Sequence, residues 1–284
     1  MVDVTYSLEG ANGDVIVFDN TTYVLRSGMA GFGIPATSVR IEDSAGDGGV
    51  WRHTKRQARS LDLPITVFGT DRADVEAKLR RLGKILQDGA GAPKFRATYQ
   101  DESSLYLNVH YVGGGETVFD NNQSGLTWAS WALMLRAPNP FWQSGVLQTV
   151  NIGTGNTGRG LLPELTKLKV TSSSSLGVVT VVNAGDVATY PVWEISGPVQ
   201  NLVISNGTQS FGFPVVYSGE VITVNTETGL VTNVNGDNIY SRLSPAPKLF
   251  LLPPGTTGLS VTGDDVDLNF NVRLTYSPRY EVIH

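Results

Sequence analysis

The chain has 284 residues, of which 40% are hydrophobic and 17% are charged, and its formal net charge is −5. This composition is typical of a folded, turn-rich chain and excludes a disordered chain, a collagen and a coiled coil. A nucleic-acid-binding protein usually has a strong basic excess, which is missing here, and the lack of cysteine excludes disulfides and thiolate metal sites. The length predicts two domains.

The first residues, Met1-Val2-Asp3, do not have the pattern of a secretory signal. The longest aliphatic cluster, Leu249 to Leu252, is too short to cross a bilayer. We therefore expect no membrane segment, and a chain that is made or assembled in a cytosol.

One segment, from about residue 71 to residue 88, has the pattern of an α-helix. Its apolar residues recur at the spacing of one helical face, at Val75, Leu79, Leu82 and Leu86. Thr70 or Asp71 suits the N-cap, and Gly89 suits a left-handed stop.

Almost all of the remaining chain alternates with the period of β-strands. Residues 105–111 alternate in this way, and residues 266–276 do so most clearly. The apolar set of the second segment is Val266, Leu268, Phe270, Val272, Leu274 and Tyr276. Turn signals separate many short strands, at Asn12-Gly13, Asn206-Gly207, Thr228-Gly229, Asn235-Gly236 and Thr262-Gly263. This pattern predicts antiparallel β-sandwich or barrel domains.

The composition changes near residue 142. The predicted helix, most of the basic residues and four of the five tryptophans precede this point. We therefore predict an α+β domain over residues 1–142, a Gly-rich connection over 143–164 and an all-β sandwich over 165–284.

No motif indicates a cofactor or a metal. The segment Gly153–Gly158 matches G-x-G-x-x-G, but no strand–helix pair surrounds it, which favours a linker. His53, His110 and His284 have no metal-ligand spacing. The acidic run Asp264–Asp267 lacks the spacing of a calcium loop, and acidic residues at the start of a strand explain it as well.

No motif indicates catalysis either. His53 lies near Asp43 and Asp47 in the sequence, but no G-x-S-x-G nucleophile elbow accompanies them. The absence of a catalytic set, together with a β-rich two-domain plan, favours a structural or binding protein.

The densest basic segment spans residues 52–59, with Arg52, Lys55, Arg56 and Arg59. It lacks the interleaved aromatic residues on which bases would stack. The segment is a solvated loop or a strand that lies opposite the acidic run of Glu42, Asp43 and Asp47.

Four segments, in chain order, carry a family resemblance. They are Tyr23–Pro35, Arg59–Ile65 leading into the helix, Ala132–Trp142 with Pro138, Pro140, Phe141 and Trp142, and Asn183–Gly197 with a later turn at Leu252–Gly255. Together they resemble the distal tail protein of long-tailed bacteriophages with non-contractile tails.

The resemblance implies structural work at the phage tail tip, in a virion assembled in the host cytoplasm. Such proteins form a hexameric ring that joins the tail tube to the tail hub or fibre proteins, and DNA leaves through the lumen without specific binding. The first domain, a split-barrel-like β fold with one helix, builds the ring, and a Pro-aromatic motif like residues 138–142 closes it. The second domain is a galectin-like or carbohydrate-module-like jelly roll.

A ring of identical chains needs two different patches that meet. Trp128 and Trp131 have opposite parity on one predicted strand, so one fills the core and the other anchors a neighbour. For the basic residues Arg52, Lys55, Arg56 and Arg59 we expect contact with the neighbouring protomer rather than with DNA, because tight DNA binding would hinder ejection.

Two other functions stay open. A glycan-binding module would use Trp193, Tyr217 or Tyr240 to stack on sugar rings, with host saccharide as the ligand. An enzyme of the tail tip, a glycosidase or a peptidase, would need acid and base residues that converge in a cleft, and no specific set is visible.

Overall fold

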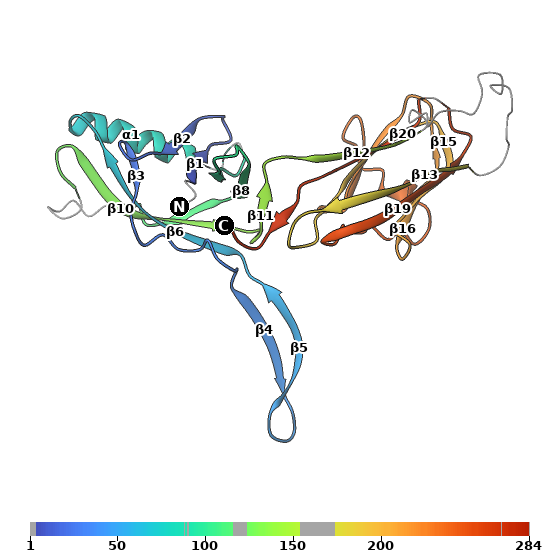
Figure 1. Cartoon of the computed structure of the whole chain (residues 1–284), viewed down its shortest axis with the longest axis horizontal. Coiled ribbons are helices and arrows are strands. Elements are labelled where there is room, and N and C mark those ends of the chain that lie inside the picture. The colour runs from blue at the N-terminus through green and yellow to red at the C-terminus, as the bar shows by residue number, and fades with distance from the viewer. Residues whose placement is uncertain are drawn as a thin grey trace. The chain divides into compact units, whose positions relative to one another are not determined.

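The computed structural model describes residues 4–87, 89, 91–115, 124–153, 174–267 and 269–283. It confirms a mainly β chain with antiparallel sheets and, in the described residues, one α-helix (Figure 1). The chain divides into two compact units. Unit 1 comprises Met1–Val146 and Tyr280–His284, and unit 2 comprises Leu147–Arg279.

Unit 1 contains a six-stranded sheet of order β2-β1-β7-β8-β11-β21 and a four-stranded sheet of order β3-β6-β10-β9. The strands of the first sheet are β1 (Thr5–Glu9), β2 (Val15–Phe18), β7 (Lys94–Thr98), β8 (Ser104–Asn108), β11 (Trp142–Ser144) and β21 (Arg279–Tyr280). The strands of the second are β3 (Tyr23–Leu25), β6 (Arg59–Phe68), β9 (His110–Gly113) and β10 (Trp128–Ala137).

The core of unit 1 lies between these sheets. Strand β6 pairs with β10 along its whole length, and every second residue of β6 is buried. The largest buried contributions to this core are Leu8, Ile16, Leu61, Leu63, Ile65, Phe95, Leu133, Leu135 and Trp142. Full burial of each such aliphatic side chain stabilises the fold by about 1.5–3 kcal/mol, which is why the alternation fixes the register.

The expected single strand over residues 105–111 is wrong, because the chain changes sheets within it. Strand β8 belongs to the six-stranded sheet and β9 to the four-stranded sheet. Val109 stands between them, fully buried, and its N–H donates to the carbonyl of Pro93 at 2.8 Å. The apolar alternation continues across this corner, so the sequence pattern does not reveal it.

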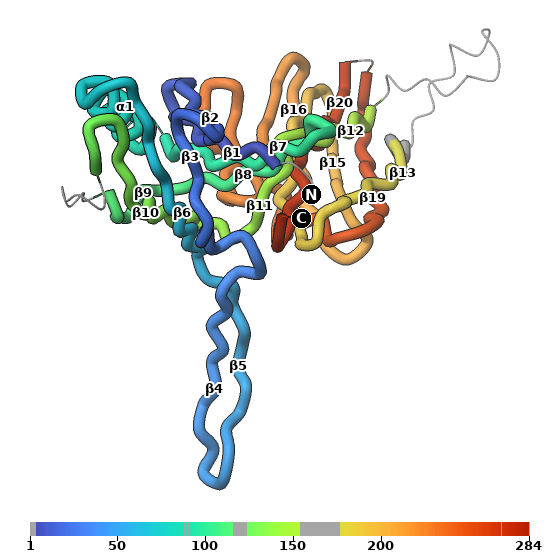
Figure 2. The backbone as a smooth tube through the Cα atoms, turned by 60° about the vertical axis from the view of Figure 1, so that its left-hand side comes forward, coloured from blue at the N-terminus to red at the C-terminus, as the bar shows by residue number. Residues whose placement is uncertain are grey.

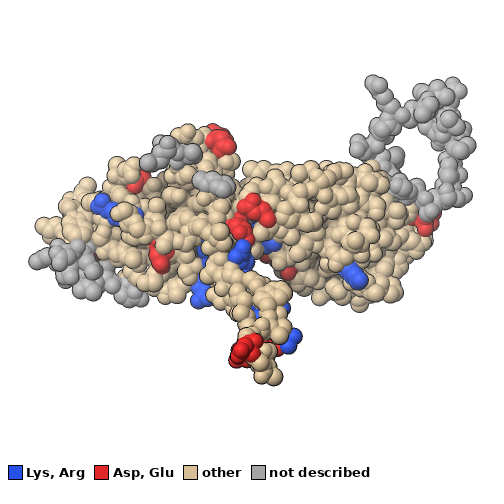
Figure 3. Space-filling model, turned by 60° about the horizontal axis from the view of Figure 1, so that its bottom comes forward, with Lys and Arg blue, Asp and Glu red and all other residues tan. Residues whose placement is uncertain are grey.

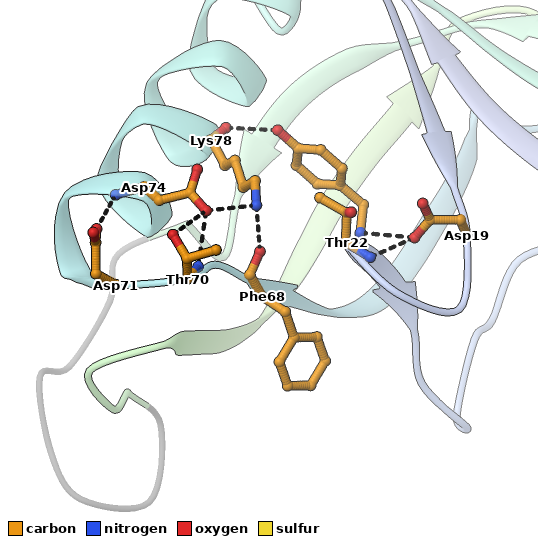
Figure 4. Close-up of polar contacts among 8 residues, drawn as sticks. Asp19, Thr22, Phe68, Thr70, Asp71, Asp74 and Lys78 are labelled. Atoms are coloured by element: carbon orange, nitrogen blue, oxygen red, sulfur yellow. Dashed lines mark hydrogen bonds and ion pairs between the residues drawn. The ribbon is translucent and has the colours of Figure 1, made fainter.

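Helix α1 (Arg72–Ile85) begins as its sequence predicts. Asp71 is the N-cap and accepts the N–H of Asp74, and the Asp74 carboxylate accepts the Lys78 ammonium at 2.9 Å (Figure 4). The same ammonium donates to the carbonyl of Phe68 at the end of β6, which ties the helix to the sheet.

The predicted end of this helix, at residue 88 with a glycine stop, is wrong. The helix ends at Ile85, and Leu86 caps it in a right-handed conformation. The Gln87 N–H then bonds to the Lys84 carbonyl at 3.4 Å, so the last turn tightens. Because the hydrogen bonds made by Leu86 and Gln87 already end the helix, a left-handed residue at Gly89 is not needed to stop it.

Unit 2 is a pair of antiparallel sheets, one of order β12-β20-β14-β17-β18 and one of order β13-β19-β15-β16, with a short 3₁₀-helix η2 (Tyr240–Arg242). The first sheet consists of β12 (Gln148–Gly153), β14 (Val192–Ser196), β17 (Val221–Asn225), β18 (Leu230–Asn233) and β20 (Asn271–Tyr276). The second consists of β13 (Ser174–Asn183), β15 (Val199–Ser205), β16 (Ser210–Val216) and β19 (Gly255–Asp264). Both sheets contribute to one core, which includes Trp193, Leu202, Phe213, Ile222, Phe250, Leu259 and Leu274.

Two strand expectations in unit 2 need correction. The expected turn at Thr262-Gly263 lies inside β19, where both residues pair with β13. The expected strand over 266–276 begins only at Asn271. The chain turns before that point. Asp265 has a left-handed backbone conformation, and the Asn269 N–H donates to the Asp267 carboxylate at 2.7 Å. Leu268 lies outside the described residues.

The expected Gly-rich connection over 143–164 also contains strands. Residues Trp142–Ser144 pair with β8 in unit 1, and Gln148–Gly153 pair with β20 in unit 2. The division between the units falls after Val146, and residues 154–173 lie outside the described residues.

Candidate functional site

An exposed β-hairpin, which we call the arm, is the most unusual feature of unit 1. Its strands β4 (Thr37–Asp43) and β5 (Gly49–Arg56) form a two-stranded sheet of their own. At the base of the arm the Gln57 N–H donates to the Ala36 carbonyl at 2.8 Å. Almost every residue of both strands is exposed, and the arm projects from the sheets of unit 1 (Figures 1 and 2).

The pairing of the two strands gives the arm an apolar face. Val39 pairs with Thr54 and Ile41 pairs with Trp51, on either side of a β-bulge. The Trp51 indole N–H donates to the Thr54 hydroxyl at 3.0 Å, so these side chains share one face. Ile41 is 60% exposed and Trp51 is 61% exposed. Nothing else in the described part of unit 1 covers this apolar face.

The opposite face of the arm is charged. Of the two alternatives for the basic segment 52–59, the structure shows the strand that lies opposite the acidic run. Glu42 on β4 accepts Arg52 from β5 at 2.6 Å and Arg40 at 3.1 Å. Lys55 is exposed on the same face. Figure 3 shows acidic and basic atoms close together on the arm. Such exposed pairs add little stability because water screens them.

Arg56 anchors the arm at its base rather than presenting a free charge. Its guanidinium bonds to the Glu281 carboxylate at 2.7 Å and to the Thr37 hydroxyl at 2.6 Å. The C-terminal residues of the chain therefore help to fix the direction in which the arm leaves unit 1.

Arg59 is buried, so the expectation that it contacts a neighbouring protomer is wrong. Only 3% of the residue is exposed. Its guanidinium donates to four backbone carbonyls, those of Gly31, Gly33, Pro140 and Glu281, at 2.5–2.7 Å. Burial lowers the pKa of Arg59 to about 10. The residue remains charged near neutral pH and joins three chain segments inside unit 1.

Trp128 and Trp131 lie on opposite faces of β10. Trp131 has the parity of the buried Leu133 and packs against the core of unit 1, where it is half-buried. Trp128 lies on the other face, opposite Phe68 of β6, and is also half-buried. Contact of Trp128 with a neighbour stays a prediction.

The segment Pro138–Trp142 fastens a corner of unit 1. Trp142 is fully buried, and its ring stacks on Phe32 with centroids 6.0 Å apart. The carbonyl of Pro140 accepts Arg59, while Phe141 is half-buried. Unit 1 continues four residues past this segment, to Val146.

Sequence reasoning missed the buried polar residues of unit 2. The Asn183 side chain donates to the carbonyls of Val187 and Leu252 at 3.0 Å. The Arg279 guanidinium donates to the Ala188 carbonyl and lies 4.4 Å from the centre of the Tyr190 ring. These contacts give a structural role to residues of the 183–197 segment.

The aromatic residues considered for sugar stacking separate into two groups. Trp193 is fully buried, so the prediction that it stacks on sugar rings is wrong. Tyr217 is 65% exposed and Tyr240 is 45% exposed. Near Tyr217, Arg242 pairs with Glu220, and hydrogen bonding from Arg242 holds the pKa of the Glu220 carboxyl below its usual range.

The described residues contain no group of three or more His, Asp or Glu side chains placed to hold a metal ion. In the acidic run, Asp264 accepts the Asn201 amide at 3.0 Å. Of the G-x-G-x-x-G segment only Gly153 is described, at the end of β12. Among the described helices, none has the length and apolar character needed to cross a bilayer.

Comparison with known proteins places the fold. No family model matches the sequence, and neither does any curated protein. The structure is similar to that of the phage SPP1 Dit protein, described as a paradigm of the hub adsorption apparatus in phages that infect Gram-positive bacteria. That match has a TM-score of 0.64 at 15% identity and covers 96% of this chain and 98% of the Dit chain.

A chain of the phage p2 baseplate, in its activated conformation with Sr or with Ca, is similar as well. The TM-score is 0.57 at 10% identity, over 99% of this chain and 100% of the other. Both likenesses extend over the two units. The chain therefore has the fold of a Dit-like phage tail and baseplate protein.

Proposed function

We propose that the chain is a structural protein of a phage tail tip that forms a hexameric ring. The observation that carries this proposal is the likeness to SPP1 Dit and the p2 baseplate chain over almost the entire length of each. The ring would join the tail tube to the hub or fibre proteins, and DNA would pass through its lumen without specific binding. It would be part of the virion and assemble in the host cytoplasm. The proposed role is not enzymatic.

The arm supports self-association. A two-stranded hairpin is marginally stable in water by itself, and this one exposes Val39, Ile41 and Trp51 on one face. An exposed apolar patch of this kind marks an interaction surface. In a ring of identical chains, a projecting element of one chain meets a different surface of the next. We therefore assign the apolar face of the arm to the contact between protomers, and we predict that Arg52 and Lys55 on the opposite face contact the neighbouring chain as well.

The test compares the full chain with a variant that lacks the arm. Thr37 and Arg56 are paired, so residues 38–55 can be replaced by Asn-Gly, a two-residue hairpin turn. This change keeps the contacts of Arg56 with Thr37 and Glu281. Light scattering after size exclusion, followed by negative-stain imaging, measures assembly.

We expect the full chain to have the mass of six protomers and ring-shaped particles, and the armless variant to be a folded monomer with unchanged thermal unfolding. Val234→Ser is the control, because Val234 is an equally exposed apolar residue of unit 2. A full chain that remains monomeric at its highest soluble concentration contradicts the proposal.

Glycan binding by unit 2 is a second candidate, favoured by the exposed rings of Tyr217 and Tyr240. Exposed aromatic rings beside charged groups suit sugar stacking and hydrogen bonding. A glycan array with the full chain tests it. Binding that disappears in Tyr217→Ala or Tyr240→Ala supports this function, and an array without signal contradicts it.

A further inference from the structure

An apolar pocket opens beside helix α1 in unit 1. We call it the helix pocket. Its volume is about 350 Å³, and its apolar lining comes from the helix and from strands β9 and β10, namely Leu79, Leu82, Leu86, Tyr111, Trp131 and Leu133. Gly83 also lines it, and a Cβ atom added there would meet no atom within 4 Å. The pocket is therefore large enough for a bulky apolar side chain.

The surroundings of the helix pocket are basic. Helix α1 carries five basic residues, Arg72, Lys78, Arg80, Arg81 and Lys84, and two acidic ones, Asp74 and Glu76. These two carboxylates pair with Arg72, Lys78 and Arg80, and Asp14 pairs with Arg81, so five basic residues face three acidic ones and leave a formal excess of two positive charges. Arg80 and Lys84 are exposed on the turn that contains Gly83. A ligand that enters the pocket thus meets an excess of positive charge.

The end of the arm has the complementary character. In the turn of the arm, residues 43–49 include Asp43 and Asp47 and no basic residue, whereas Glu42 is already paired with Arg40 and Arg52. Trp51 and Ile41 stand next to this acidic turn on the apolar face. Within one chain the arm leaves Trp51 61% exposed, so its own unit does not supply the partner.

We propose that the helix pocket of one copy of the chain receives the Trp51 side chain from the arm of a second copy, with the acidic end of the arm against α1. This inference rests on the proposed ring. The arm of one copy would contact the helix pocket of the next copy, so the two surfaces that meet are different. Contacts between two different surfaces are the kind that can close a ring of identical subunits. The buried indole would be the anchor, and the charge pairing would fix the orientation and speed the encounter.

Crosslinking tests the contact directly, because the chain has no cysteine. Ile41 pairs with Trp51 on the same face of the arm, so a cysteine at position 41 leaves the indole in place. Ile41→Cys and Gly83→Cys chains are mixed and oxidised, and mass spectrometry identifies the disulfide. We expect a crosslink between the two different variants. A mixture of Ile41→Cys with Gln209→Cys, an exposed position of unit 2, is the control and should give none.

A blocked pocket gives the second readout. Gly83→Trp would fill the pocket of its own chain, whereas Gly83→Ala leaves it open. We expect Gly83→Trp to remain monomeric with unchanged circular dichroism, and Gly83→Ala to assemble like the parent chain.

The outcomes separate this inference from the ring itself. If the parent chain assembles, but no crosslink forms between positions 41 and 83 and Gly83→Trp still assembles, the pocket contact is wrong and the ring stands. The pocket would then be left to another tail protein. If the parent chain is monomeric and no crosslink forms, both are wrong.

Discussion

Arg59 is buried, whereas Arg52 and Lys55 are exposed, although all three belong to one basic segment. Arg52 and Lys55 stand on the exposed arm, whereas Arg59 begins β6 with the parity of the buried Leu61. Four carbonyls replace the water that the guanidinium loses on burial. Residue type alone could not predict this difference, because it depends on where the arm joins the sheet.

The ion pair between Glu9 and Arg96 gives unit 1 a pH dependence. Arg96 donates two hydrogen bonds to this carboxylate, at 2.7 and 2.9 Å, and they hold the pKa of Glu9 below its usual value. The pair therefore stabilises the fold fully at pH values above the pKa of Glu9 in the unfolded chain, about 4.3. This stabilisation is lost as the pH falls through the lower pKa of Glu9 in the folded chain.

We expect Glu9→Gln to lower the free energy of unfolding by about 1–2 kcal/mol at neutral pH. The difference from the parent chain should shrink below pH ~4. Urea unfolding at a series of pH values measures it. Glu76→Gln removes two more exposed pairs, with Arg72 and Arg80, and should cost less than ~0.5 kcal/mol at every pH. A constant deficit for Glu9→Gln across the acid range would show that the pair does not titrate as stated.

The segment that joins β3 to the arm contains two glycines with different constraints. Gly31 has a φ of +95°, and a Cβ atom there would lie 2.0 Å from the Ser60 carbonyl oxygen. Gly33 has open space around its Cα. Both carbonyls accept the Arg59 guanidinium. The two positions therefore share the contact with Arg59 and differ in backbone conformation and in steric room.

We expect Gly31→Ala to destabilise unit 1 by about 2–4 kcal/mol, because the backbone of β6 must move away and the left-handed conformation becomes strained. Gly33→Ala should change stability by less than ~0.5 kcal/mol. Thermal and urea unfolding of both variants measure this. Equal effects of the two substitutions would show that neither backbone clearance nor the left-handed conformation limits position 31.

Periodicity predicted some elements well and others poorly, for physical reasons. The stripe of Val75 and Leu82 marked α1, because a surface helix buries one face. The corner at Val109 stayed hidden, because apolar residues alternate in the sequence on both sides of it, although Tyr111 beyond the corner is exposed. The apolar face of the arm was missed as well. Val39 and Ile41 alternate like a core strand, and only the structure shows that no core lies beneath them.

At the scale of the whole molecule, the chain crosses between the units twice. It leaves unit 1 after Val146 and returns at Tyr280, and Glu281 then holds Arg56. A composition shift near residue 142 indicates the first crossing. Nothing in the sequence indicates the second, because the returning segment is short and its partners lie far away along the chain.

Unit 2 contains a complete core of its own, so we expect residues 147–279 to fold when excised. Trp193 is the only tryptophan in this range, and it is fully buried against Phe211 and Phe250. Its fluorescence therefore reports on this core alone. The fragment should show blue-shifted emission and one cooperative urea transition, and Trp193→Phe should abolish the signal while circular dichroism is kept. Red-shifted emission without a transition would mean that unit 2 needs unit 1 to fold, even though the two cores share no residue in the described part of the chain.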